Sequence, residues 1–200
     1  RALEPYKINP KFIEILRLAP YNTRGTDVPV VLDKMIHDID IVLSLVDSKV
    51  RSISASGLSI LTDSIDIAQA QIKFENGCVS SITSSRIAKD EVRKIKTFQQ
   101  NLYSTVDLYK GLTEVYTVSK KNWDKKSFLM SVPFDYKNKT RHIIYEKPTI
   151  VKEDALKLEL INFTKSVKGL EKPIVDGQSG RDALNVAIEI QEKIINGFIS

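Results

Sequence analysis

A series of short strand-like segments separated by tight turns fills the middle of the chain, and it constrains the fold more than any other feature. The segments are rich in Val, Ile, Thr, Ser and Tyr. Glu75-Asn76-Gly77 and Lys110-Gly111 are tight-turn signals between them. Consecutive strands joined by short turns pair antiparallel. The predicted strands in this region are residues 50–61, 66–74, 78–87, 94–108, 113–119 and 142–145.

A strand and a helix are predicted before this region, and two helices after it. Residues 11–19 form a strand-like run, and Asp27 is a good N-cap for a helix that runs to about Val46 with Pro29 in its first turn. The apolar residues of this helix recur with its period and predict one buried stripe: Leu32, Met35, Ile36, Ile39, Val42, Leu43 and Val46. The later helices are predicted at 152–167 and 180–196. The second of these is expected to bury Leu184, Ala187, Ile188, Ile194 and either Ile190 or Gln191.

This order of elements predicts an α+β fold, with a large, mostly antiparallel, open-faced β-sheet and helices on one face. Small polar residues share one face of two predicted strands: Ser52, Ser54 and Ser56 on the first, Ser80 and Ser84 on the other. Such a face is not typical of a core. We interpret it either as exposed to solvent or as packing against something outside the domain, such as another subunit.

Composition excludes several classes of protein. No stretch has the roughly 18 uncharged apolar residues of a membrane span, and the single cysteine, Cys78, cannot form an internal disulfide. We therefore predict a cytoplasmic protein without a membrane partner. The net charge of +5 is concentrated between Arg86 and Arg141, where 13 basic residues stand against 6 acidic ones. Because no nucleic-acid motif accompanies that charge, we interpret the segment as a solvated sheet edge and predict no nucleic-acid partner.

Asp33 and His37 are the residues best suited to catalysis. They lie four apart in the predicted helix, on the face opposite its apolar stripe. A carboxylate can orient a nearby imidazole, and the imidazole can take a proton from a hydroxyl group near neutral pH. The same spacing also occurs in plain surface pairs. His142 is the only other histidine, so a metal site is not predicted, and no glycine-rich phosphate or dinucleotide loop occurs.

The sequence also resembles a known family. Residues 22–27 (NTRGTD), followed by 31–40 (VLDKMIHDID), are similar to the start of the second domain of the glucose–fructose oxidoreductase / inositol dehydrogenase / rhizopine catabolism (Gfo/Idh/MocA) family. The turn at 74–79 and the tail at 173–184 support the resemblance. Members pair an N-terminal Rossmann domain, which binds NAD or NADP, with a dihydrodipicolinate-reductase-like C-terminal domain. The sheet of that domain shapes the substrate site and the oligomer interface.

The resemblance implies roles for individual residues. His37 matches the general acid/base, which accepts the proton of a substrate hydroxyl as hydride leaves for the nicotinamide, and Asp33 matches the carboxylate that binds substrate or orients the histidine. Substrate contacts are expected from Asn22, Arg24, Thr26 and Arg86. The family's catalytic lysine, in Glu-Lys-Pro, belongs to the Rossmann domain. We interpret the Glu-Lys-Pro at 146–148 and at 171–173 as coincidence, because both lie downstream of the Asp/His helix.

The resemblance also implies how the chain is organised. Residues 1–10 are expected to be the remnant of the crossover from a missing Rossmann domain, and residues 11–200 to form a substrate-binding and oligomerisation domain. The chain would be half of an NAD(P)-dependent oxidoreductase acting on a sugar, cyclitol or nucleotide-sugar hydroxyl, inactive alone and homo-oligomeric through its sheet. The alternative is a non-catalytic oligomerisation or ligand-sensing module of the same fold. The cofactor, NAD or NADP, would be bound mainly by the missing domain.

Overall fold

The computed structural model describes residues 3–23, 25–119, 129–150 and 154–197. Nine strands and three α-helices occur in these residues, with one turn of π-helix (η1) directly before the first α-helix. The strands are β1 (Phe12–Leu18), β2 (Val50–Leu58), β3 (Ile67–Phe74), β4 (Val79–Ser85), β5 (Val92–Gln99), β6 (Leu102–Asp107), β7 (Leu112–Ser119), β8 (Met130–Tyr136) and β9 (Lys139–Glu146). The helices are η1 (Val31–Met35), α1 (Ile36–Leu45), α2 (Ala155–Val167) and α3 (Gly177–Gly197).

All nine strands form one sheet, in the order β2-β3-β4-β1-β5-β6-β7-β9-β8. Only β1 and β4 run parallel, and every other neighbouring pair is antiparallel. Strand β1 comes first in the chain but lies inside the sheet, between β4 and β5. The predicted α+β class with a mostly antiparallel sheet is confirmed.

Two strand predictions need correction. Residues 94–108 are not one strand, because the chain turns at Asn101, which has a positive φ of 62°, and so separates β5 from β6. Strand β8 was not predicted at all. It is an edge strand that contains Pro133 and pairs only with β9. None of its residues is buried, so its sequence lacks the alternation of buried and exposed residues that predicts a strand.

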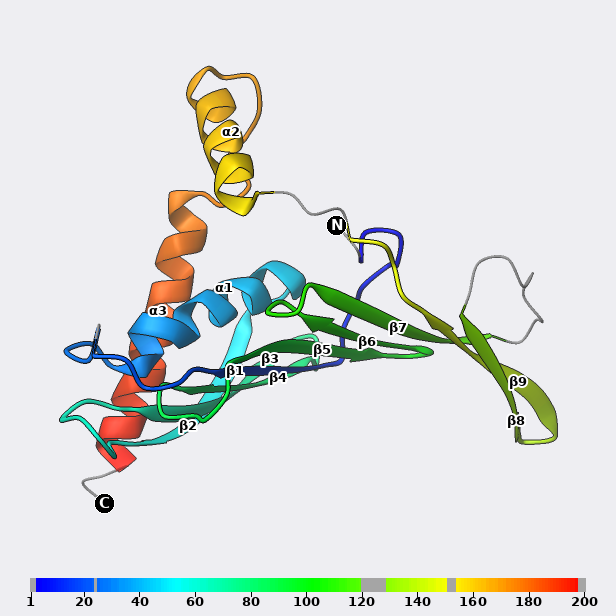
Figure 1. Ribbon diagram of the computed structural model, residues 1–200, viewed down its shortest axis with the longest axis horizontal. Helices are drawn as coiled ribbons and strands as arrows, with labels where there is room; N and C mark the ends of the chain where they lie inside the picture. The colour runs from blue at the N-terminus through cyan, green and yellow to red at the C-terminus, as the bar shows by residue number, and fades with distance from the viewer. Residues whose placement is uncertain (1–2, 24, 120–128, 151–153, 198–200) are drawn as a thin grey trace.

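Helices α1 and α3 cover one face of the sheet (Figure 1). The core lies between them and the strands, where Ile13, Ile15, Ile72 and Ile82 are buried. The predicted stripe of the first helix is confirmed, since Met35, Ile39, Val42 and Val46 are buried, and Leu32, Ile36 and Leu43 pack against the core.

The predicted stripe of α3 is confirmed in part. Ala187, Ile194 and, of the two alternatives, Ile190 are buried as predicted. Leu184 and Ile188 are each 41% exposed, and Ala183 is buried instead. The buried face follows the close contact of the helix with the sheet beneath it, where a Cβ on Gly57 of β2 would stand only 3.1 Å from Cδ1 of Ile194.

The serine rows lie on opposite faces of the sheet. Ser52, Ser54 and Ser56 are exposed on the face without helices. Ser80 and Ser84 are buried on the helix-covered face, in the same row of alternate positions as Ile82, so the expectation of an outside partner for these two is wrong. The hydroxyl oxygens of both have no hydrogen-bond partner among the described residues.

Aromatic rings form a continuous row across the face of the sheet that lacks helices. Cross-strand pairing brings together Phe12, Phe98, Tyr103, Tyr116 and Tyr145, from β1, β5, β6, β7 and β9. Neighbouring ring centroids lie between 4.8 and 5.7 Å apart. Such pairs stabilise a sheet, and here they also make one exposed face partly apolar.

Helix α2 stands apart from the sheet (Figure 1). Asp154 caps it by accepting a hydrogen bond from the backbone N–H of Lys157, and Gly169 follows its end with a φ of 69°. This agrees with the helix predicted for 152–167. None of its side chains is buried, although Leu156, Leu160 and Phe163 are apolar. No helix in the described part of the chain is long and apolar enough to cross a membrane.

Candidate active site

A pocket of about 210 Å³ opens where β1 leaves the sheet. Three parts of the chain meet there: the end of β1, the η1–α1 helix, and the start of β5. The lining residues are Arg17, Leu18, Ala19, Asp33, Lys34, His37 and Arg93. Both residues predicted to carry the chemistry therefore face one pocket.

The helix that carries Asp33 and His37 begins later than predicted. Residues 25–28 form a turn, in which Val28 N–H donates to the Gly25 carbonyl at 3.4 Å, and the helix starts only after Pro29. Asp27 is therefore not its N-cap. The first turn is a π-helix, in which the N–H of Ile36 donates to the carbonyl of Val31 five residues earlier. π-Helical turns are rare in proteins, and those that do occur are often found at functional sites.

Asp33 and His37 differ in exposure. The Asp33 side chain is 34% exposed, and its Oδ2 lies 3.4 Å from Nζ of Lys34. The backbone of Gly25 lies against the carboxylate, since a Cβ there would be 3.6 Å from Oδ1 of Asp33. His37 is exposed in the first turn of α1, at the rim of the same pocket. This arrangement leaves the imidazole open to a molecule that enters the pocket.

An ion pair below His37 fixes this part of the helix to the sheet. Arg17 of β1 binds Asp38 of α1 through two hydrogen bonds, Nε to Oδ2 and Nη2 to Oδ1, both 2.6 Å long. Asp38 is 1% exposed. A two-point arginine–carboxylate contact is directional, so it sets how the helix lies on β1 and where His37 stands. The one sign of this ion pair in the sequence is that Asp38 stands directly before Ile39, a residue of the apolar stripe.

Each basic side chain of the pocket wall has an acidic neighbour. Among the described lining residues, Arg17, Lys34 and Arg93 are basic and Asp33 is acidic. Arg17 binds Asp38, and Lys34 lies 3.4 Å from Asp33. Arg93 contacts Glu91 at 2.7 Å, yet its side chain stays 48% exposed, so it remains accessible to an anionic group of a ligand.

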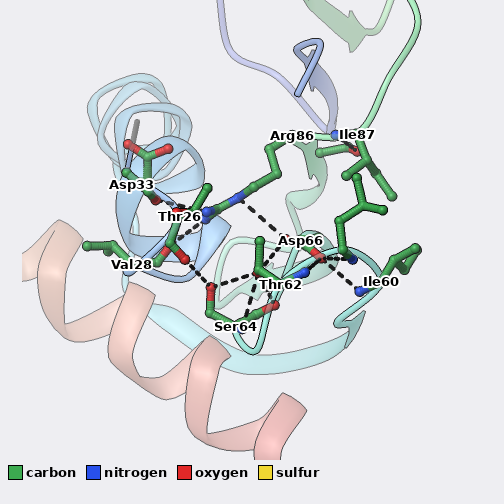
Figure 2. Close-up of polar contacts among 12 residues, drawn as sticks. Thr26, Val28, Asp33, Ile60, Thr62, Ser64, Asp66, Arg86 and Ile87 are labelled. Atoms are coloured by element: carbon green, nitrogen blue, oxygen red, sulfur yellow. Dashed lines mark hydrogen bonds and ion pairs between the residues drawn. The ribbon is translucent and has the colours of Figure 1, made fainter. Parts of the chain in front are cut away.

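Of the four predicted substrate contacts, the three that the structure describes are not among the lining residues of this pocket. Asn22 is exposed in the loop after β1, and Arg24 lies outside the described residues. Thr26 lines a neighbouring hollow of about 420 Å³ with Thr62 and Ser64. Arg86 is 3% exposed, so its side chain points into the protein, where it contacts the 25–28 turn (Figure 2). Substrate contact by these residues stays a prediction.

Asp66 is the carboxylate with the most hydrogen bonds near the site. Burial alone would raise its pKa, but a hydrogen bond from the Thr62 hydroxyl and three from the backbone amides of Ile60, Leu61 and Thr62 outweigh that effect. Together they lower the pKa of Asp66 to about 2. The group is therefore a permanent anion at neutral pH.

The other histidine lies elsewhere. His142 is on β9 and pairs with Ser119 of β7. Within the described ranges, no group of three or more His, Cys, Asp or Glu side chains could hold a metal ion. The sheet has a single parallel pair of strands, so these residues also contain no unit of the kind that binds a dinucleotide. What the pocket offers is a base, a carboxylate and positive charge.

Known proteins resemble the chain in sequence and fold. The UDP-N-acetylglucosamine 3-dehydrogenase of Acidithiobacillus ferrooxidans is 28% identical over 182 residues, which are 91% of this chain and 54% of that enzyme. A solved structure of that enzyme matches with a TM-score of 0.79 at 26% identity, over 96% of this chain and 55% of that one. The WlbA dehydrogenase of Bordetella pertussis, solved with NADH and UDP-GlcNAcA, shares the fold at 13% identity, with a TM-score of 0.65 over 98% of this chain and 56% of that one.

The open, mostly antiparallel sheet with helices on one face matches the fold of these solved dehydrogenases over about half of their length. Residues 19–99 match the sequence profile of the GFO/IDH/MocA C-terminal domain. Over these residues the chain is similar to the C-terminal domain of that family. It spans about half the length of the relatives it matches.

Proposed function

We propose that the chain is the substrate-binding and acid/base half of a nicotinamide-dependent dehydrogenase that acts on a hydroxyl group of a nucleotide-linked sugar. The observation that carries the proposal is the shared pocket of Asp33 and His37 at the end of β1. The relative of known activity, a UDP-N-acetylglucosamine dehydrogenase, supports the substrate class. The half-exposed Arg93 at the pocket also supports it, since a nucleotide sugar carries a diphosphate that an arginine can bind.

In this proposal the chain's own residues handle the proton. A substrate hydroxyl enters the pocket and donates a hydrogen bond to the exposed imidazole of His37. The imidazole takes the proton as the C–H bond of the same carbon is broken, and returns it in the reverse reaction. Asp33 binds the substrate or orients the imidazole. A nicotinamide cofactor, when bound, supplies the hydride acceptor.

The cofactor itself would be held by a part that this chain does not contain. We propose that residues 1–10 lead in from a Rossmann domain, and that residues 11–200 are the substrate-binding domain. The additional length of the relatives fits such a domain. The described residues alone are then expected to neither bind the cofactor tightly nor turn over substrate, and the choice between NAD and NADP would belong to the other half.

The direct test is the substitution His37→Ala in the complete enzyme. We expect kcat to fall by roughly 10²–10⁴, because a general base contributes about that much, with KM for the nucleotide sugar little changed. His142→Ala makes the same change on β9, outside the pocket, and serves as the matched control. Equal turnover in both variants would remove His37 from the mechanism. No turnover in the complete wild-type protein would favour the alternative, a non-catalytic module.

A further inference from the structure

Two buried charges lie next to the candidate active site and take no part in the proposed proton transfer. Arg86, directly after β4, is 3% exposed, and Asp66, directly before β3, is 0% exposed. Removing charged groups from water is costly unless they are bound by specific partners. The groups that Asp66 and Arg86 contact therefore indicate the structural role of these two charges.

Asp66 organises the loop that precedes β3. Its Oδ2 accepts hydrogen bonds from the amides of Ile60, Leu61 and Thr62 at 2.7, 2.6 and 3.0 Å. Its Oδ1 accepts from the Thr62 hydroxyl at 2.7 Å and lies 3.9 Å from Nε of Arg86. The backbone joins the same two residues, since the N–H of Arg86 donates to the carbonyl of Asp66 at 3.0 Å. Asp66 thus holds the loop through hydrogen bonds and faces the guanidinium as an ion pair, since Nε of Arg86 has no hydrogen-bond partner among the described residues.

The far end of Arg86 binds main-chain carbonyls of the 25–28 turn (Figure 2). Nη1 donates to the carbonyl of Gly25 at 2.8 Å, and Nη2 donates to the carbonyl of Val28. The loop before β3 holds the same turn from the other side, because Oγ of Ser64 donates to the carbonyl of Thr26 at 3.0 Å. Three of the four carbonyls of this partly exposed turn are therefore held, two by Arg86 and one by Ser64.

This turn lies against Asp33. Gly25 has a φ of 75°, and a Cβ on it would be in van der Waals contact with the Asp33 carboxylate, 3.6 Å from Oδ1. The turn also leads directly into Pro29, whose carbonyl accepts from the amides of Leu32 and Asp33, both at 3.0 Å. The position of the turn therefore sets both the start of η1 and the wall behind the carboxylate.

We propose that Arg86 is a positioning residue, which Asp66 orients and which holds the 25–28 turn against the carboxylate of Asp33. The catalytic meaning of this role rests on the proposed function, but the contact itself does not. Arginine suits the role because its planar guanidinium can bind Asp66 on one side and two carbonyls on the other, which the single ammonium of lysine cannot do.

The test is hydrogen–deuterium exchange of residues 25–33 in this chain, with the ¹³C carboxyl chemical shift of Asp33 recorded at pH 7. In Arg86→Met we expect exchange in 25–33 to rise at least about tenfold and the chemical shift of the Asp33 carboxyl carbon to change, while protection in β3 and the first half of β4 stays unchanged. Arg86→Lys is expected to fall between Arg86→Met and the wild type. Arg51→Met, at an exposed arginine of β2, is the matched control.

If Arg86→Met does not fold, Arg86→Lys and Ser64→Ala decide the question, since each removes only part of the contact. If a folded variant shows unchanged hydrogen–deuterium exchange in residues 25–33 and an unchanged carboxyl chemical shift of Asp33, the positioning role is overturned. In the complete enzyme, Arg86→Lys is expected to lower kcat by roughly ten- to hundredfold at nearly constant KM. A variant in which the turn exchanges faster but kcat is unchanged would support the structural role of Arg86. It would contradict the role proposed for Asp33 in catalysis.

Discussion

Arg93 stands at the rim of the pocket with about half of its side chain exposed. If it binds the diphosphate of a nucleotide sugar, Arg93→Ala should raise KM for that substrate by roughly 10- to 100-fold, since a hydrogen bond to a charged group contributes about 1.5–3 kcal/mol. The expected kcat changes little. Steady-state kinetics with the nucleotide sugar and with the same sugar lacking the nucleotide provide the measurement.

The comparison of the two substrates makes this prediction specific. KM for the free sugar should be the same in Arg93→Ala and in the wild type, because that substrate has no anionic group. Arg51→Ala, far along the sheet on β2, should change neither value. An equal rise in KM for both substrates would show that Arg93 contributes to the shape of the pocket and does not bind the diphosphate.

Asp66 makes a second residue-level prediction, on stability against pH. Its pKa in the folded protein, about 2, is below the usual 3.8, so the folded state favours the ionised form. This contribution to stability is fully present above about pH 4 and is lost as the pH falls toward 2. Urea unfolding at pH 7, 4 and 2.5 should therefore show Asp66→Asn much less stable than the wild type at pH 7, with the difference shrinking in acid. Asp63→Asn, exposed in the same loop, should follow the wild type throughout.

At the scale of elements, helix α3 allows a test of its own packing. Ile190 is fully buried, whereas Ile188, two residues earlier, is 41% exposed. Ile190→Ala should lower the free energy of unfolding by about 2–5 kcal/mol, as large-to-small core substitutions do. Ile188→Ala should cost less than about 1 kcal/mol. Chemical denaturation of both variants measures the difference. The reverse order would contradict the burial of Ile190 and the exposure of Ile188 in the structure.

Sequence periodicity was sufficient for elements that have one buried face. The first helix, β1 and the strands on either side of Gly77 were predicted from local patterns, because alternation or a 3.6-residue repeat is visible within each segment. Strand β8 has no buried face, so it carries no such pattern. The place of β1 beside β4 depends on pairing over more than sixty residues of chain, which no local signal specifies.

In the candidate site, too, local features could be predicted from the sequence and contacts between distant segments could not. Asp33 and His37 share one helix, so their spacing alone predicted that they face the same way, and both line the pocket. The contacts of Arg17 with Asp38, and of Arg86 with the 25–28 turn, join elements that are distant in sequence. For Arg86 the sequence predicted a functional arginine without showing that its side chain is buried.

At the scale of the whole molecule, the aromatic row on the helix-free face supports the proposed homo-oligomer. We expect the chain to sediment as a dimer or larger assembly at micromolar concentration, because this face combines stacked rings with small polar side chains. Tyr116→Glu should shift it toward the monomer by burying a charge. Ile174→Glu, 83% exposed and outside the sheet, should leave the assembly unchanged. A monomeric wild-type chain would contradict the proposal.

The inserted position of β1 has a consequence for how the protein acquires its shape. A ribosome makes β1 before the other strands of this sheet, yet its two neighbours in the sheet, β4 and β5, are made much later. Until then the backbone amides and carbonyls of β1 have no strand to pair with, and Ile13 and Ile15 have no core to pack into. The pocket wall contributed by Arg17 is consequently completed late, so the candidate site and the centre of the sheet should become native in the same kinetic step.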